Sequence, residues 1–325
     1  MEAIYPRSRD ETGPLPDQRE IVDLCKRFWD LEVNNVCRAN SQCVFFCDSL
    51  RDGRVVFRVN PGWDGSNHPR TIVEFVRHLA DRGAPCPDIR PTTDGSPCKS
   101  VRDLVISVES FLEGKVVDRV DTLRSVGEAL ARVHDASEDF PIFSSEVKDA
   151  RLYISDALEY CERTTFSSNA AEAVALLRAQ LNNTPNRMNV RWLLCRGDVR
   201  SWNTIASPSG EVRFTDFNSA HFAPALVDVV MVRMQWLIGT VGRQLSDDEM
   251  QRFVAGYFSV RPPSEDERTA LPLIFAAWYA RRLCQLHRKW SPSSPNRKTW
   301  ELDDRILALP HAAIRMGEAA IEGID

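Results

Sequence analysis

Three oxygen-bearing side chains stand close together in the second half of this chain. Asp198 and Asn203 are separated by four residues, and Asp216 follows in the segment Thr-Asp-Phe. The residues between Asn203 and Asp216 have the pattern of a short hairpin, because two strand-like runs flank the turn residues Pro-Ser-Gly-Glu. Since a hairpin brings its two ends together, we expect these three side chains to converge.

This combination of residue types suits phosphoryl transfer with a divalent cation. An aspartate can accept the proton of an attacking hydroxyl group, while an amide oxygen and a second carboxylate hold Mg²⁺, which prefers oxygen ligands. The metal would neutralise charge between the phosphates of a nucleotide, so the protein mainly positions and stabilises the reacting groups. The pattern therefore predicts Asp198 as the catalytic residue, and Asn203 and Asp216 as metal ligands.

Two other interpretations of the same segment are weaker. The tripeptide Arg196-Gly197-Asp198 occurs in cell-adhesion loops, but the polar N-terminal segment has no apolar signal-peptide core, and we expect a cytoplasmic protein. The polar residues could also be ordinary turn and cap residues. That explanation does not account for the second aspartate behind a hairpin or for the β-rich region upstream.

The composition is that of an ordinary globular protein. The 325 residues, 43% of them hydrophobic and 27% charged, suffice for one large domain or two lobes. The net charge of −5 argues against a nucleic-acid partner held by a global positive field, and no apolar run approaches the roughly 20 residues of a membrane span. The nine cysteines form no CxxC pair, so we expect free thiols. The composition does not distinguish a monomer from an oligomer.

The predicted elements change in character along the chain. Residues 17–31 and 69–83 carry apolar side chains at helical spacing, and residues 43–60 predict a hairpin around Asp52-Gly53. Residues 103–114 predict a buried strand and a short connector, and most of the later segments are helical. We therefore predict a small β-rich, nucleotide-binding lobe at 1–110 and a larger helical lobe at 111–325, with the catalytic loop and the acceptor site.

Several motifs resemble the aminoglycoside phosphotransferase and choline kinase-like family, which is related to protein kinases. The segment RGDVRSWN resembles the family's HGDxxxxN catalytic loop, and FTDFNSAHFAPALVDVV resembles its IDFxxA…DxA segment, with Asp228 at the second acidic position. The segment GEALARVHDAS is similar to the family's GxxLAxLH helix, in which we expect His134 to be a structural, hydrogen-bonded residue. The resemblance covers most of the chain from about residue 30 and implies an α+β, protein-kinase-like two-lobe fold.

The resemblance also implies roles for individual residues. Asp198 would be the catalytic aspartate, and Asn203 and Asp216 the metal ligands. Arg58 would bind the nucleotide phosphates, which its forked guanidinium suits, and Glu74 on the following helix is its predicted ion-pair partner. Because no glycine-rich loop is recognisable, we expect a polar turn to cover the phosphates, formed by Asn40, Ser41 and Gln42. The backbone of the linker between the lobes is expected to meet adenine, at Glu109, Ser110 and Phe111.

The implied activity is that of an ATP- and Mg²⁺-dependent kinase that phosphorylates a hydroxyl group of a small organic molecule, such as an aminoglycoside-like antibiotic, an amino alcohol or another metabolite. The alternatives are a protein Ser/Thr kinase and a catalytically weak pseudokinase that acts as a binding module. Arg196 stands where the family usually has a histidine, which motivates the last alternative. The short segment between Asp216 and Asp228 leaves little chain for a peptide platform and favours a small-molecule acceptor.

Overall fold

The computed structural model describes residues 15–39, 43–61, 68–117, 119–143, 145–163, 168–182, 187–238 and 243–289. They belong to two compact units: the chain up to Val116 together with Asn203–Ser219, and Val117–Trp202 together with the chain from Ala220 onward. The hairpin between Asn203 and Asp216 is thus part of the first unit. The two functional lobes predicted at 1–110 and 111–325 remain a prediction.

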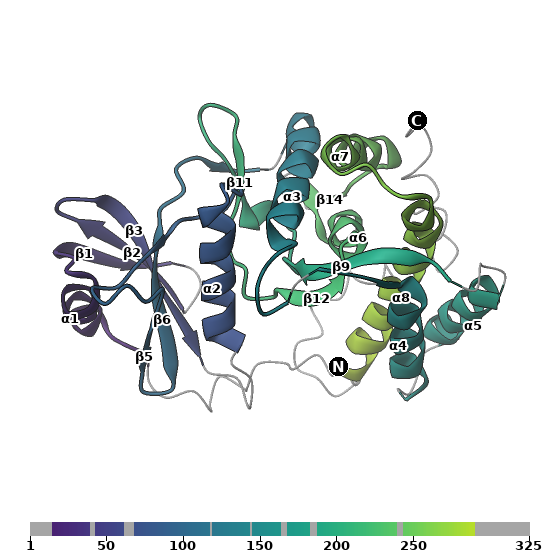
Figure 1. Ribbon diagram of the computed structural model, residues 1–325, viewed down its shortest axis with the longest axis horizontal. Helices are drawn as coiled ribbons and strands as arrows, with labels where there is room; N and C mark the ends of the chain where they lie inside the picture. Colours follow the sequence, from purple (N-terminus) through teal and green to yellow (C-terminus); the bar gives the residue numbers. More distant parts are fainter. Residues whose placement is uncertain are drawn as a thin grey trace. The chain divides into compact units, whose positions relative to one another are not determined.

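The first unit is built on an antiparallel sheet in the order β1-β2-β3-β6-β4, with β5 paired to β6 (Figure 1). Its strands are β1 (Val33–Arg38), β2 (Val44–Ser49), β3 (Gly53–Pro61), β4 (Ile89–Arg90), β5 (Lys99–Val101) and β6 (Leu104–Ser110). Strands β2 and β3 form the hairpin predicted around Asp52-Gly53, and Gly53 has the positive φ of 71° that its turn requires. The predicted β-rich region is confirmed.

The two faces of strand β3 have different roles. Val55, Phe57 and Val59 point into an apolar core that helix α1 (Gln18–Trp29) covers. Because side chains alternate between the faces of a strand, Arg58 and Asn60 belong to the opposite face. Helix α2 (His68–Asp81) lies on that side of the sheet in Figure 1. The charged residue predicted to meet phosphates therefore projects away from the apolar core.

The two predicted metal ligands lie at the end of a second, smaller sheet of the first unit. It has the order β11-β10-β7, with β10 (Thr204–Ala206) and β11 (Val212–Phe214) forming the predicted hairpin and β7 (Lys115–Val116) beside it. Gly114 permits the approach of β7, because a Cβ atom there would lie 2.2 Å from the carbonyl oxygen of Ala206. The ring of Phe217, one residue after Asp216, packs edge-on against the ring of Phe75 on α2, with 6.2 Å between the ring centroids.

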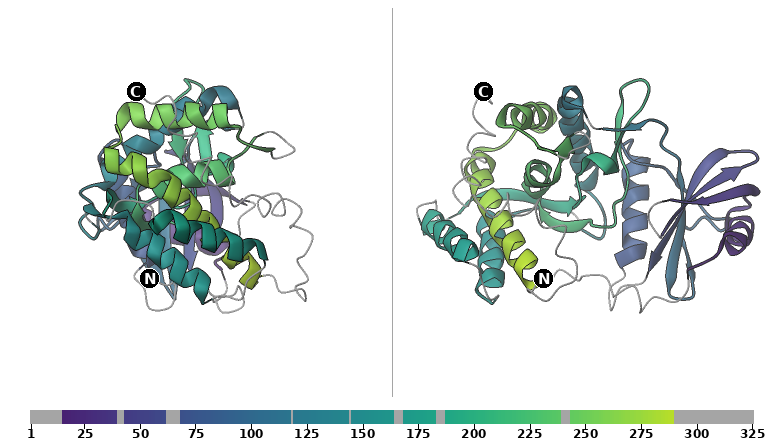
Figure 2. Two further views of the ribbon diagram at one scale, coloured as in Figure 1. Left: turned by 90° about the vertical axis from the view of Figure 1, so that its right-hand side faces the viewer. Right: turned by 180° about the vertical axis from the view of Figure 1, so that it is seen from behind.

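The second unit is mainly helical, as predicted. Its helices are α3 (Leu123–Ser137), α4 (Ala150–Glu162), α5 (Ser168–Asn182), α6 (Leu226–Gln235), α7 (Asp247–Val260) and α8 (Glu265–Lys289), preceded by the short η1 (Val120–Thr122). Helices α3 and α7 approach closely at Gly127, where a Cβ atom would lie 2.1 Å from the carbonyl oxygen of Phe253. Helices α4, α5 and α8 lie side by side, which the two views of Figure 2 show.

Short strands complete the second unit. They are β8 (Glu146–Asp149), β9 (Asn189–Cys195) and β12 (His221–Pro224) in one sheet, and β13 (Leu237–Ile238) and β14 (Arg243–Gln244) in another. Strand β9 ends at Cys195, directly before Arg196, so the sheet fixes the start of the predicted catalytic loop. Within the described part of the chain, no helix is both long enough and apolar enough to cross a membrane.

Candidate functional site

The hairpin of the first unit brings the two predicted metal ligands to its open end. The last paired residues are Thr204 and Phe214, and the N–H of Thr215 donates to the carbonyl oxygen of Asn203 at 3.0 Å. Asn203, which closes the short η2 turn (Ser201–Asn203), and Asp216 therefore flank the same end of the hairpin. Asp216 has a φ of 62°, an uncommon conformation for a residue other than glycine that is often found at functional sites.

The side chain of Asp216 has an acceptor atom that the protein does not satisfy. Its Oδ1 is buried and has no hydrogen-bond partner among the described residues, although the Nη1 of Arg58 lies 3.6 Å away. Buried acceptors normally have a partner, so such an atom suggests an additional ligand. A carboxylate and an amide side chain at one hairpin end are oxygen donors, and this donor set fits a hard cation such as Mg²⁺.

Arg58 lies between two carboxylates. Its Nε and Nη2 donate to the Oε1 and Oε2 of Glu109 at 2.8 and 3.2 Å, and its Nη1 faces Asp216. Burial alone would lower the pKa of Arg58, but the carboxylates of Glu109 and Asp216 outweigh it, and the pKa lies above its usual value. Arg58 is therefore a buried, permanently charged group directed toward a carboxylate predicted to bind metal.

The ion-pair partner predicted for Arg58 was wrong: it is Glu109 on β6, not Glu74 on α2. Strands β3 and β6 pair so that Val56 is opposite Glu109 and Arg58 is opposite Ser107, which puts Arg58 and Glu109 on one face of the sheet as diagonal neighbours. This register joins residues far apart in sequence. The local pattern of each strand contains no information about it.

Of the other residues predicted to contact the nucleotide, the structure describes Ser110 and Phe111. Asn40, Ser41 and Gln42 lie outside the described residues. The hydroxyl of Ser110 accepts from the N–H of Asp88 at 2.9 Å, and the ring of Phe111 packs edge-on against Phe46 at 5.7 Å. These side chains hold the segment after β6 in place. Adenine binding by its backbone remains a prediction.

In the second unit, the loop after β9 carries Asp198. The side chain of Asp198 is mostly buried, with 20% exposed, and forms an ion pair with the Nε of Arg200. The guanidinium of Arg200 lies over the ring of Trp202 at 5.1 Å. Arg200 is not among the site residues predicted from the sequence. The signal that could have identified it is a basic residue two positions after the predicted catalytic aspartate.

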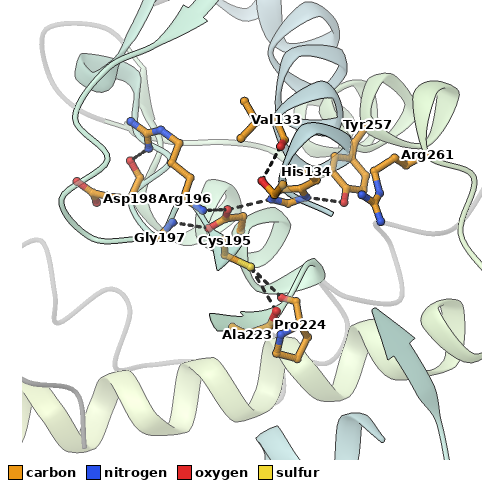
Figure 3. A network of polar contacts seen from close by, with 12 residues as sticks. Val133, His134, Cys195, Arg196, Gly197, Asp198, Ala223, Pro224, Tyr257 and Arg261 are labelled. Atoms are coloured by element: carbon orange, nitrogen blue, oxygen red, sulfur yellow. Dashed lines mark hydrogen bonds and ion pairs between the residues drawn. The ribbon is translucent and has the colours of Figure 1, made fainter. Parts of the chain in front are cut away.

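A buried carboxylate, that of Asp228, binds the backbone at the start of the same loop; Figure 3 shows the hydrogen bonds around Arg196 and Gly197. The Oδ2 of Asp228 accepts from the backbone N–H of Arg196 at 2.7 Å and from the Nε2 of His134 at 3.0 Å, and its Oδ1 accepts from the N–H of Gly197 at 2.9 Å. The Arg196 guanidinium donates to the main-chain oxygen of Asp198. The backbone that presents Asp198 is therefore fixed from two sides.

His134 is the buried, hydrogen-bonded structural residue that the sequence predicted. Burial lowers the pKa of His134 in spite of the neighbouring Asp228 carboxylate, so the ring is neutral at pH 7. Because a carboxylate only accepts, Nε2 carries the proton, and Nδ1 accepts from the Tyr257 hydroxyl at 2.8 Å. Burial alone would raise the pKa of Asp228, but the bonds from His134 and Gly197 outweigh it and the pKa lies below its usual value.

His134, Cys195 and Asp228 together offer three metal-ligating atoms within 4.8 Å of one another. All three residues are buried, and their polar atoms already have protein partners. Cys195 donates to the carbonyl oxygens of Ala223 and Pro224 at 3.5 and 3.4 Å, and burial raises the pKa of its thiol well above the usual value. A metal would need the thiolate. The cluster is therefore a hydrogen-bond network that supports the loop.

Comparisons with known proteins identify the family of the chain. The sequence model of the phosphotransferase enzyme family (APH) matches residues 39–271, which is most of the chain. The homoserine kinase of Paraburkholderia xenovorans (strain LB400) is 26% identical over 215 residues, covering 60% of this chain and 62% of that protein. The chain thus spans about 62% of the length of this curated relative.

Two solved structures have a similar fold. Spectinomycin phosphotransferase APH(9)-Ia, in complex with ADP and spectinomycin, aligns with a TM-score of 0.66 at 13% identity, covering 95% of this chain and 99% of that one. The amicoumacin kinase hAmiN, in complex with AMP-PNP, Ca²⁺ and Ami, aligns with a TM-score of 0.64 at 14% identity, covering 91% and 93%. At these identities the likeness shows the fold alone, and the predicted kinase-like α+β fold is confirmed.

Proposed function

The chain belongs to the phosphotransferase enzyme family, and we propose that it transfers the terminal phosphoryl group of ATP to a hydroxyl group of a small organic molecule. The observation that carries the proposal is the carboxylate of Asp216. One of its oxygens is buried and accepts no hydrogen bond from the described part of the chain, lies 3.6 Å from Arg58, and is at the hairpin end that also presents Asn203. A cation ligand beside a fixed guanidinium is what Mg²⁺ and the phosphates of a nucleotide require.

In the proposed reaction, Asn203 and Asp216 would hold Mg²⁺, and Arg58 would bind phosphate oxygens. When bound by Asn203 and Asp216, Mg²⁺ would neutralise charge on the phosphates. Asp198 accepts the proton of the acceptor hydroxyl, whose oxygen forms a bond to the γ-phosphorus while the bond to the β,γ-bridging oxygen breaks and ADP leaves. Arg200, paired with Asp198, adds a cation near the reacting group.

A small-molecule acceptor is supported by the chain that follows Asp216. Strand β12 begins at His221 and helix α6 at Leu226, so only a few residues separate Asp216 from the next ordered elements. Such a short segment offers little support for a bound peptide. The names of the relatives, a homoserine kinase, a spectinomycin phosphotransferase and an amicoumacin kinase, refer to small molecules. We therefore propose a small alcohol, such as an amino alcohol or an antibiotic.

The test is phosphate transfer from Mg·ATP to a panel of homoserine, amino alcohols and aminoglycoside-type antibiotics, with the products identified by mass spectrometry. We expect one phosphorylated small molecule, and no product with the Asp198→Ala variant. Transfer to generic protein substrates alone would favour a protein kinase. Binding of Mg·ATP without transfer to any acceptor would favour the pseudokinase alternative.

A further inference from the structure

We propose that Glu109, on strand β6, is the residue that positions Arg58 for the phosphates of the nucleotide, in place of Glu74 on helix α2, the ion-pair partner that the sequence predicts. The inference rests on the proposed function and concerns the nucleotide half of that site.

The guanidinium of Arg58 is fixed in orientation. Both side chains of the pair are almost fully buried, with 8% of Arg58 and 7% of Glu109 exposed. Glu109 binds the Nε–Nη2 edge with both of its oxygens, which is the geometry that a planar fork favours. As a result, the Nη1 group is directed toward the Oδ1 of Asp216. Glu109 thus determines which N–H groups of Arg58 face the predicted metal ligand.

The elements that carry this pair are neighbouring strands of one sheet. Arg58 and Glu109 lie on β3 and β6, which pair along their length, from Val55 with Ser110 to Pro61 with Leu104. In protein kinases the corresponding ion pair joins a strand to a helix, and the placement of that helix controls activity. Here both partners belong to one sheet. The orientation of Arg58 should therefore be independent of α2.

The same face of the sheet carries further buried polar groups. Asn60 is two residues after Arg58 on β3, and Ser107 is two residues before Glu109 on β6, so both share its face. The Nδ2 of Asn60 and the Oγ of Ser107 are buried without a hydrogen-bond partner among the described residues. A core face would not collect four polar side chains. This face is built to meet polar groups of a ligand or of water.

A buried ion pair is a weak source of stability, because removing two charges from water costs about as much as their attraction returns. The main effect of the Arg58–Glu109 pair is therefore expected to be on the orientation of the Arg58 guanidinium and not on the stability of the fold. A glutamine at position 109 would keep the shape of the side chain. It would lose the charge and one of the two acceptor oxygens, and so release the guanidinium.

The experiment compares Glu109→Gln with Glu74→Gln by titrating each variant with Mg·ATP in a calorimeter. We expect the Kd of Glu109→Gln to rise about 10- to 100-fold, as when a supporting partner of a binding group is lost, and that of Glu74→Gln to stay within about twofold of the wild type. Glu109→Asp keeps the charge on a shorter side chain and should give an intermediate Kd. It also serves as the second variant if Glu109→Gln does not fold.

A double mutant separates positioning from a general structural effect. If Glu109 acts through Arg58, adding Glu109→Gln to Arg58→Gln should change the Kd for Mg·ATP by less than about twofold, because the group that it positions is already absent. An equal loss in both backgrounds would overturn the inference. So would wild-type or tighter binding by Glu109→Gln, or a loss in Glu74→Gln of the same size.

The same titration distinguishes this inference from the proposed function. If the wild-type protein does not bind Mg·ATP, the proposed function fails and the inference fails with it. If the wild type binds and Glu109→Gln binds equally well, the kinase proposal stands and only the role of Glu109 is overturned.

Discussion

Replacing Asp228 by asparagine should lower the free energy of unfolding by about 3–5 kcal/mol and disturb the loop that carries Asp198. The carboxylate is fully buried and accepts from three donors, the N–H groups of Arg196 and Gly197 and the Nε2–H of His134. Asparagine has one oxygen and an NH₂ group. Whichever way the amide is turned, at least one of these donors faces another donor.

The magnitude follows from counting the groups left without a partner. If the amide oxygen replaces Oδ2, the N–H of Gly197 and an amide N–H of the new side chain are both buried and unsatisfied, at about 1–3 kcal/mol each. The two remaining hydrogen bonds also lose the assistance of the charge, which adds about 1 kcal/mol in total. The sum lies near 3–5 kcal/mol when some relaxation of the loop is allowed.

Urea unfolding at pH 7.5, followed by tryptophan fluorescence and circular dichroism, measures this loss. The matched control is Asp121→Asn, which removes the same charge from an exposed pair with Arg119 and should change the free energy by less than about 0.5 kcal/mol. In the absence of urea, kcat should fall about 100-fold, because the loop backbone is displaced. A loss below about 1 kcal/mol for Asp228→Asn, or one equal to the control, would refute the three-donor argument.

Four further predictions concern the remaining site residues. Asp198→Ala should abolish turnover and leave the Kd for Mg·ATP near the wild-type value in calorimetry, because this group acts on the acceptor; unchanged turnover would contradict its role. Asp216→Asn should weaken Mg·ATP binding more than Asp198→Ala does, and equal affinities would contradict the metal assignment. Arg200→Ala should lower kcat in steady-state assays, whereas Arg213→Ala, which disrupts an exposed pair with Glu211, should not. Burial lowers the pKa of His134, so as the pH falls the unfolded chain is protonated there before the folded protein is. The free energy of unfolding should therefore decrease below about pH 6.5, by at most about 1.4 kcal/mol per pH unit. Urea unfolding between pH 7 and 5 should show a shallower dependence in His134→Gln, and identical slopes would refute this.

The parts of the first unit that the sequence predicted are those with local signals. The turn at Asp52-Gly53 has its own chemistry, and so do the two ends of the hairpin at Asn203 and Asp216. Each of these signals lies within a few residues of the chain, so a single sequence was sufficient to find them.

The partners across the fold were harder to predict. Glu109 pairs with Arg58 through the register of β3 and β6, and neither strand's own pattern specifies that register. His134 was expected to be hydrogen-bonded, but its partners Asp228 and Tyr257 come from α6 and α7. Packing of distant elements decides such contacts. A helix-start signal, in contrast, is local: Ser246 and Glu249 form the capping box that opens α7.

Arg196 is the departure from the family pattern that raised the pseudokinase alternative, and its contacts bear on that question. The residue is fully buried, its N–H donates to Asp228, and its guanidinium donates to the main-chain oxygen of Asp198. A histidine in that position would also supply a ring N–H donor to the loop. Arg196 can therefore give the structural support that the resemblance assigns to the histidine, without taking part in the chemistry. Since Asp198, Asn203 and Asp216 are all retained, this arrangement favours an active kinase over a binding module.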